Sequence, residues 1–241
     1  MIINLVNTGW EIIYHRAHAL LAAQLAGYWN SSADISHTVE IVSAISHHDD
    51  LEREWEGDHL SEAGAPLDFT LDGQLCVEEL RQHINNARYR SRWVALLTAM
   101  HVSYLNQGRR QESKDLDRFL DELEQQQQQW LKDMEVKPVQ ADRAYALMRW
   151  CDRLSLILCQ RNLPDAQRSL EITPGPDEKG YTVRQRADDT ITVEPWPFKP
   201  KKFSVHVDAT YVNQMAFEDN QEFIEQLQTA AVQLIVWQFE K

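Results

Sequence analysis

Apolar residues recur at helical spacing through most of the first 160 residues of the chain. In the opening helix, which we expect over about residues 15–27, alanine and leucine cover more than one face, so this helix should be buried. The same pattern predicts five further helices. They run from Ile41 to His48, over residues 75–86, from Trp93 to Tyr104, and over residues 112–135 and 141–160.

The start of the chain has two apolar runs, MIINLV and WEIIY, on either side of the break NTG. A short break with glycine between β-branched runs is typical of a β-hairpin, which is the structure we expect. Thr8 and Glu11 also have the spacing of a capping box. A helix that begins at residue 9 is therefore the alternative.

The period of the pattern changes beyond Pro164. Between Ser169 and Phe198, short β-branched runs alternate with Pro-Gly and Asp-Asp turns, which predicts three strands, and KKFSVHVDATYV predicts a fourth. These strands would form a small antiparallel sheet. In the last segment, apolar residues return at helical spacing, and we expect a closing helix that packs back onto the body.

Together these elements predict a mainly α protein with a small antiparallel β appendage, an α+β arrangement. A chain of 241 residues is long enough for one sizeable hydrophobic core, so we expect a single domain over residues 1–241. Its parts are a helical core over residues 15–162, the β appendage over 168–214 and the closing helix over 217–240. Residues 51–70 mix acidic residues with Gly and Pro and are expected to form an ordered loop.

The charge balance of the chain indicates which classes of partner it can bind. The chain has 24 Lys and Arg against 37 Asp and Glu, and this formal net charge of -13 disfavours nucleic acid and anionic membranes. No run approaches about 18 apolar residues, and the N-terminus lacks the pattern of an export signal. The three cysteines form no CxxC pair and lie in apolar contexts, which favours inert packing. We expect a cytoplasmic protein that takes a small, anionic substrate, and the oligomeric state stays open.

Ionisable residues fall on or beside the apolar faces of several predicted helices. They are His18, the pair His48 and Asp49, His101, and Asp152. Buried ionisable groups are costly unless they are paired or bind a cation, so several of them in one core favour a shared metal site. Imidazoles with carboxylates suit iron, manganese, zinc or cobalt better than magnesium. Polar core groups that only hydrogen-bond one another are the alternative.

The order of these residues resembles that of the HD superfamily of metal-dependent phosphohydrolases. The resemblance rests on RAHALLAAQLA, IVSAISHHDD and MRWCDRLSL, and covers about residues 15–160. It implies an HD-like helical bundle with a bound divalent metal, iron or manganese above all, as one or two ions. The ligands that it implies are His18, His48, Asp49 and Asp152, with Asp49 bridging two ions and His101 at a second position. The doublet continues as HHDDLEREW, without the glycine usual in that superfamily.

A similarity over nearly the whole chain leads to an uncharacterised bacterial family known only as a domain of unknown function. The matching segments are His18-Ala19, His48 to Asp50, PLDF (Pro66 to Phe69), LLxxxH (Leu96 to His101), DRLSL (Asp152 to Leu156) and PWPF (Pro195 to Phe198). This resemblance supports the site and implies no particular reaction.

Further residues could serve such a site. Asp50 follows the doublet and is a candidate to orient a ligand histidine or to act on a metal-bound water, with an exposed carboxylate as the alternative. Two basic clusters are candidates to hold an anionic substrate, although solvation is the usual role of such groups. They are Arg88, Arg90 and Arg92, and Lys199, Lys201 and Lys202. We expect the remaining histidines at the surface, namely His15, His37, His47, His59, His83 and His206.

Three functions are compatible with this pattern. The preferred one is a hydrolase that cleaves a small phosphoester or nucleotide with a metal-activated water, with Asp49 and Asp50 as catalytic residues. A di-iron oxygenase of small molecules would use the same ligands. A non-catalytic binding or regulatory module would use the polar residues for stability and the β appendage to meet a partner.

Overall fold

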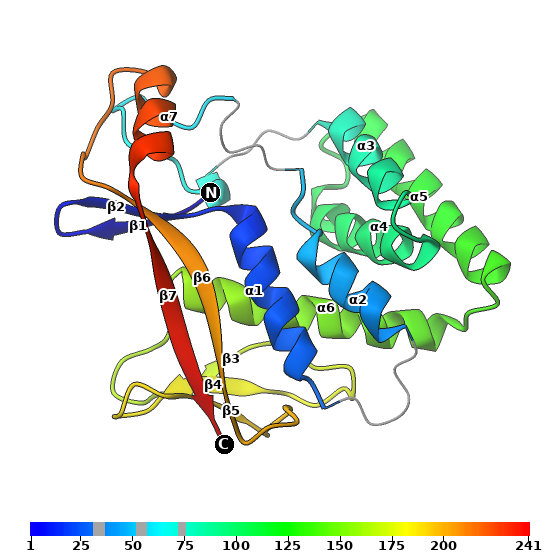
Figure 1. Ribbon diagram of the computed structural model, residues 1–241. Coiled ribbons are helices and arrows are strands. Elements are labelled where there is room, and N and C mark those ends of the chain that lie inside the picture. Colours follow the sequence, from blue (N-terminus) through cyan, green and yellow to red (C-terminus); the bar gives the residue numbers. More distant parts are fainter. Residues whose placement is uncertain (31–36, 52–56, 72–75) are drawn as a thin grey trace.

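The computed structural model describes residues 1–30, 37–51, 57–71 and 76–241, and it has an α/β fold (Figure 1). The described strands form one curled, mixed sheet of seven strands, and most helices pack to one side of its two longest strands. The expected HD-like helical bundle with a β appendage is therefore wrong. The sheet takes strands from both ends of the chain, so it is a main part of the fold and not an appendage.

The sheet joins segments that lie far apart in the sequence. Its strands are β1 (Ile2–Val6), β2 (Gly9–Ile13), β3 (Leu170–Glu171), β4 (Thr182–Gln185), β5 (Ile191–Glu194), β6 (Lys202–Val212) and β7 (Ala231–Glu240). Their order across the sheet is β1-β2-β6-β7-β5-β4-β3. Neighbouring strands are antiparallel, except that β5 and β7 are parallel. Of the four strands expected as one small antiparallel sheet, β3, β4 and β5 are antiparallel neighbours, but β6 is separated from them by β7, so the expected separate sheet is wrong.

The helices expected in the first 160 residues are confirmed. They are α1 (His15–Tyr28), α2 (Thr38–Ser46), α3 (Val77–Ala87), α4 (Arg92–Asn106), α5 (Lys114–Asp133) and α6 (Pro138–Cys159). Ser91 and Ser113 cap α4 and α5 by accepting backbone N–H groups. The expected loop over residues 51–70 leads into the 3-10 helix η1 (Phe69–Leu71), and its residues 52–56 lie outside the described part. None of the described helices has the length and apolar character needed to cross a membrane.

The hairpin at the start of the chain is confirmed, and the alternative of a helix from residue 9 is wrong. β1 pairs with β2 from Ile2 opposite Ile13 to Val6 opposite Gly9. β2 then continues the sheet onto β6. At Gly9, whose φ is 154°, an added Cβ would lie 2.0 Å from the carbonyl oxygen of Val212. The close approach of the hairpin to β6 therefore requires glycine.

The closing helix expected over residues 217–240 is half wrong. The helix α7 spans only Asn220–Thr229, and β7 follows it directly. β7 pairs with β6 along its whole length, from Ala231 opposite Tyr211 to Glu240 opposite Lys202. The run VQLIVWQFE is rich in β-branched and aromatic residues, which favour strands when a partner strand is available. Its apolar residues satisfy the helical period and the alternating period alike, so tertiary pairing decides.

An aromatic cluster joins the helices to the sheet. Trp150 of α6 is fully buried, and its ring packs edge-on against those of Trp29, Tyr181 and Phe198. Phe198, in the PWPF segment, also contacts Phe239 of β7. The PWPF segment therefore contributes hydrophobic packing. One continuous core holds α1 against both β6 and α6, which fixes the helices that carry the candidate site.

Candidate metal centre

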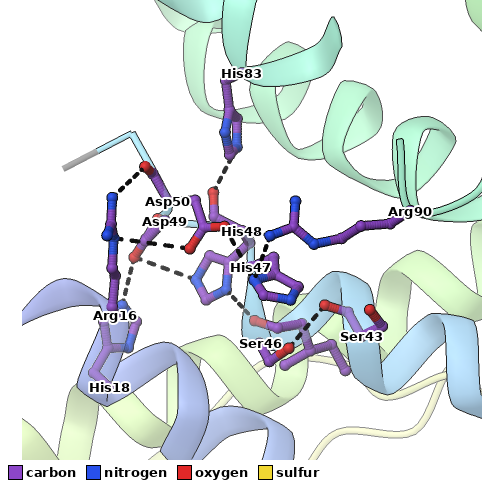
Figure 2. A network of polar contacts seen from close by, with 11 residues as sticks. Arg16, His18, Ser43, Ser46, His47, His48, Asp49, Asp50, His83 and Arg90 are labelled. Carbon is purple, nitrogen blue, oxygen red and sulfur yellow. Dashed lines mark hydrogen bonds and ion pairs between the residues drawn. The ribbon is translucent and has the colours of Figure 1, made fainter. Parts of the chain in front are cut away.

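Four helical elements bring the predicted ligands to one place, and Figure 2 shows His18, His48 and Asp49 among them. His18 lies on α1, His101 on α4 and Asp152 on α6, while His48 and Asp49 lie in the turn directly after α2. Two overlapping groups form there, and within each group one ligand atom per residue lies within 4.8 Å of the others. The groups are His18, His48 and Asp152, and His48, Asp49 and His101. The structure thus brings all five residues together.

His48 is the centre of the cluster. Its side chain is 1% exposed, and its Nδ1 donates a hydrogen bond to the carbonyl oxygen of Ile45, 2.6 Å away. That bond turns Nε2 toward Oδ2 of Asp49, at 3.4 Å, and Oδ1 of Asp152, at 3.3 Å. Nε2 is buried and makes no geometrically satisfactory hydrogen bond with any described residue. A buried imidazole nitrogen therefore faces two carboxylates with its remaining bonding position open.

His18 approaches the same carboxylate from α1. Its Nε2 lies 2.5 Å from Oδ2 of Asp49, and its Nδ1 lies 2.9 Å from Oγ of Ser155. The Ser155 hydroxyl donates to the carbonyl oxygen of Asp152, so its oxygen is free to accept the Nδ1 proton of His18. Ser155 thereby fixes the ring so that Nε2 faces the cluster. This is the outer-shell arrangement found around metal-bound histidines.

The carboxylates of Asp49 and Asp152 require a balancing positive charge in the cluster. Burial opposes protonation of His48, but the carboxylates of Asp49 and Asp152 outweigh it and raise the pKa of His48 to about 10. Burial also disfavours the ionised acids, yet the neighbouring His48 and His18 hold the pKa of Asp49 well below its usual value. His48 likewise lowers the pKa of Asp152 against the effect of burial. Both acids stay ionised, so a proton or a cation must balance them.

His101 closes the cluster from α4. Burial, together with the nearby charge of His48, lowers the pKa of His101 to about 4, so this ring is neutral near pH 7. Its Nδ1 lies 3.3 Å from the hydroxyl oxygen of Tyr145. When Nδ1 donates to that oxygen, Nε2 keeps a lone pair that can bind a metal. Burial raises the pKa of Tyr145, which therefore remains a neutral phenol.

Two separations around Nε2 of His48 fit one coordination shell. Two atoms that each lie about 2.1 Å from an ion are about 3.0 Å apart at a right angle and about 3.4 Å apart at the tetrahedral angle. The separations of 3.3 and 3.4 Å around Nε2 of His48 fall near these values. Imidazole nitrogens together with carboxylate oxygens suit manganese, iron, cobalt or zinc. The chemistry of the donor set therefore fits a divalent transition metal.

Two buried histidines around the cluster were expected at the surface. His83 donates from Nε2 to the carbonyl oxygen of His48, at 3.0 Å, and supports the turn that carries the doublet (Figure 2). His15 lies one turn before His18 on α1 and packs its ring against those of His18 and Phe69. Burial is the larger influence on His83 and lowers its pKa. Because His15 and His18 are three residues apart, helical spacing could have indicated the burial of His15.

Asp50 lies beside the cluster but turns its carboxylate away from the other ligands. Oδ2 of Asp50 contacts Nδ1 of His47 at 3.0 Å and Nη2 of Arg90 at 3.1 Å. Arg16 reaches the same residue from α1, with Nε 3.9 Å from Oδ1 and Nη2 donating to the Asp50 carbonyl oxygen at 3.0 Å. Arg16 was not predicted, because nothing in its spacing separates it from a solvated arginine. Figure 2 shows Arg16 and Arg90 on opposite sides of the doublet.

A pocket of about 1340 Å³ opens over the cluster. His48, Asp49 and His101 line it, together with Arg16 and Arg90. Its size exceeds the range of about 300–1,000 Å³ that is usual for small-molecule sites, so a nucleotide-sized ligand has room. Among the described residues, the other predicted basic groups do not line this pocket. They are Arg88, Arg92, Lys199, Lys201 and Lys202, of which Arg92 donates to the carbonyl oxygen of Asp133 and Lys202 pairs with Glu240.

The cysteines follow the expectation of inert packing at two of three positions. Cys151 and Cys159 are buried, and burial raises the pKa of both thiols. Cys76 is exposed at the start of α3 and lines the pocket, which corrects the expectation for this residue. The sequence around Cys76 has no period that could have distinguished an exposed cysteine from a buried one.

Comparison with known proteins places the chain in a family without assigning it a reaction. No curated protein and no solved structure matches it. The expected relationship to the HD superfamily gains no support from these comparisons, and the fold differs from the expected bundle. A family model with the description "Protein of unknown function (DUF3891)" matches residues 1–214. The chain therefore belongs to the uncharacterised DUF3891 family.

Proposed function

We propose that this protein is a metal-dependent hydrolase that cleaves a small phosphoester with water. The observation that carries the proposal is the geometry of His48. Its buried Nε2 faces Asp49 and Asp152 at 3.4 and 3.3 Å, while Nδ1 is engaged by the Ile45 carbonyl. Two ionised carboxylates beside an imidazole nitrogen that makes no satisfactory hydrogen bond favour a cation site over a satisfied polar core.

Each residue of the cluster has a distinct role in the proposal. His18, His48 and Asp152 would hold one divalent cation, iron or manganese above all, and Asp49 with His101 would extend the site to a second ion. A bound cation would supply a Lewis acid for a phosphoryl oxygen and lower the pKa of a bound water. Asp49, whose side chain is 25% exposed, lines the pocket and would orient the attacking water. Water attacks phosphorus, the ester P–O bond breaks, and a water proton ends on the departing alcohol.

The arginines beside the cluster support an anionic substrate. Arg16 and Arg90 line the pocket and converge on Asp50, which holds their guanidinium groups in place. Guanidinium groups bind phosphoryl oxygens through paired N–H donors, and pre-ordered ones lose less entropy when they do so. We therefore assign Asp50 a positioning role for the arginines, in place of the direct role at the metal that the sequence predicted.

Replacing Arg90 by Gln should weaken orthophosphate binding to the metal-loaded protein by about tenfold or more, the usual loss for a charged hydrogen bond. Metal content should be unchanged, because Arg90 contacts Asp50 and His47 and none of the proposed ligands. Isothermal titration with orthophosphate measures the change. Arg88→Gln is the matched control, since Arg88 lies on the neighbouring turn outside the pocket lining. Equal losses in the two variants would refute the role of Arg90.

The hydrolase proposal is tested on protein stripped of metal and reloaded with manganese or iron. We expect release of alcohol and phosphate from a panel of small phosphomonoesters and phosphodiesters, dependent on the added ion and lost in His48→Gln. Oxygen consumption by the iron-loaded protein, without phosphoester cleavage, would favour a di-iron oxygenase instead. A protein that binds no metal in any preparation would favour the non-catalytic module.

A further inference from the structure

The long strand β7 has an open edge. On one side it pairs with β6 from Ala231 to Glu240. On the other side, within the described part of the chain, β5 meets it only at Phe239, which lies opposite Ile191. The eight residues 231–238 therefore present one edge without a partner strand, about 27 Å long at the rise of an antiparallel strand.

The exposed part of this strand is strongly apolar. Val232, Leu234 and Val236 project from the face of β7 that does not meet the core, and they are 60%, 57% and 48% exposed. Their neighbours Ala231 and Gln233 are exposed as well, so the first four residues of β7 meet solvent on both faces of the sheet. Such a row of aliphatic side chains along a strand edge is unusual for a surface that remains open.

The usual protection of an edge strand is missing from β7. Open edges are normally interrupted by charged residues, proline, bulges or short length. From Ala231 to Phe239 the sequence AVQLIVWQF contains no charged residue, no proline and no glycine, and the pairing with β6 runs without a bulge. The strand can therefore accept another strand on this side, where no described residue before Phe239 pairs with it.

We propose that β7 pairs with β7 of a second copy of this chain, forming a two-fold homodimer with a continuous sheet across the interface. Antiparallel pairing centred on Leu234 places this residue opposite its own copy and Val232 opposite Val236 of the partner subunit. The apolar row is then self-complementary, and the free backbone groups of both edges gain hydrogen bonds.

Charge favours a second copy over a charged partner. The chain has a formal net charge of -13, so two copies repel one another over most of their surfaces. β7 offers nine consecutive residues without charge, where two copies can approach at little electrostatic cost. α3 and α4, which carry much of the pocket lining, lie on the far side of α1 from the β6–β7 ribbon, so the proposed dimer leaves both pockets open (Figure 1).

Sedimentation velocity over a range of concentrations tests the dimer. We expect wild-type protein to shift from 28.1 kDa toward twice that mass as its concentration rises. Leu234→Lys should weaken the dimer at least about tenfold, because it places two like charges opposite one another and removes apolar contact. His206→Lys is the matched control, since His206 is exposed on β6 opposite Val236 and one strand away from the edge.

At low concentration, where the wild type is monomeric, the far-UV circular dichroism and melting temperature of Leu234→Lys should match those of the wild type, because the side chain is more than half exposed. A wild-type protein that stays monomeric at high concentration overturns the proposal. So does any dimer or larger assembly that persists unchanged in Leu234→Lys, and so does an equal weakening by His206→Lys.

Discussion

Replacing Asp152 by Asn is expected to weaken the binding of manganese by more than about 100-fold. Loss of a residue that only hydrogen-bonds a metal ligand costs about 10–100-fold, and Asp152 is proposed as a ligand itself. Asn keeps the size of the side chain but removes the negative charge that faces Nε2 of His48. The remaining ligands then lack one of the two carboxylates that balance a divalent cation. Competition with a fluorescent chelator, starting from metal-free protein, measures the affinity.

Asp208→Asn is the matched control for this experiment, because Asp208 is exposed on β6 and belongs to no ligand group. It should bind manganese like the wild type. Ser155→Ala should give an intermediate result, a loss of about 10–100-fold, because it removes the hydrogen bond that orients His18 and the bond to the Asp152 carbonyl oxygen but no candidate ligand atom. Wild-type affinity in Asp152→Asn would mean that any bound metal lies elsewhere.

Replacing Trp150 by Ala should lower the free energy of unfolding by about 3–5 kcal/mol, the usual cost of removing a large aromatic side chain from a core. Trp150 is fully buried and touches rings from the end of α1, from the segment before β4 and from the PWPF segment. The cavity would separate α6 from the sheet, and neither surface can collapse onto the other. Urea denaturation monitored by circular dichroism measures the change.

Trp196→Ala serves as the comparison for Trp150→Ala. Trp196 is only partly buried, at the edge of the same aromatic cluster, and its Nε1 donates to the carbonyl oxygen of Pro200. Its removal should therefore cost clearly less than removal of Trp150. A loss under about 1 kcal/mol in Trp150→Ala, the range of surface changes, would show that helices and sheet do not share this core.

Local pattern was enough to predict the helices and the hairpin, but not the sheet. α1 to α6 carry long apolar stripes whose period excludes a strand, and the hairpin has its turn within three residues. The pairing of β2 with β6 joins residues about 200 positions apart, and no local feature of either strand specifies it. The apolar residues of β7 fit the helical and the alternating period alike, so only pairing with β6 decides that this segment forms a strand.

The candidate site was more accessible to sequence reasoning than the fold class. His18, His48 and Asp152 stood out because ionisable residues on apolar helical faces require an explanation. These residues were identified from the faces of single helices, so the wrong prediction of the overall architecture did not affect their identification. The roles of Arg16 and His83 were not predicted, because they depend on the turn after α2, whose path the helical period does not determine.

An anomalous diffraction measurement on crystals of the manganese- or iron-loaded protein tests the central claim most directly. We expect a peak about 2.0–2.3 Å from Nε2 of His48 and from a carboxylate oxygen of Asp152, at ordinary metal–ligand distances. A second peak between Asp49 and His101 would correspond to a second ion. A metal-loaded crystal without a peak at His48, or with its metal bound elsewhere, would contradict the account.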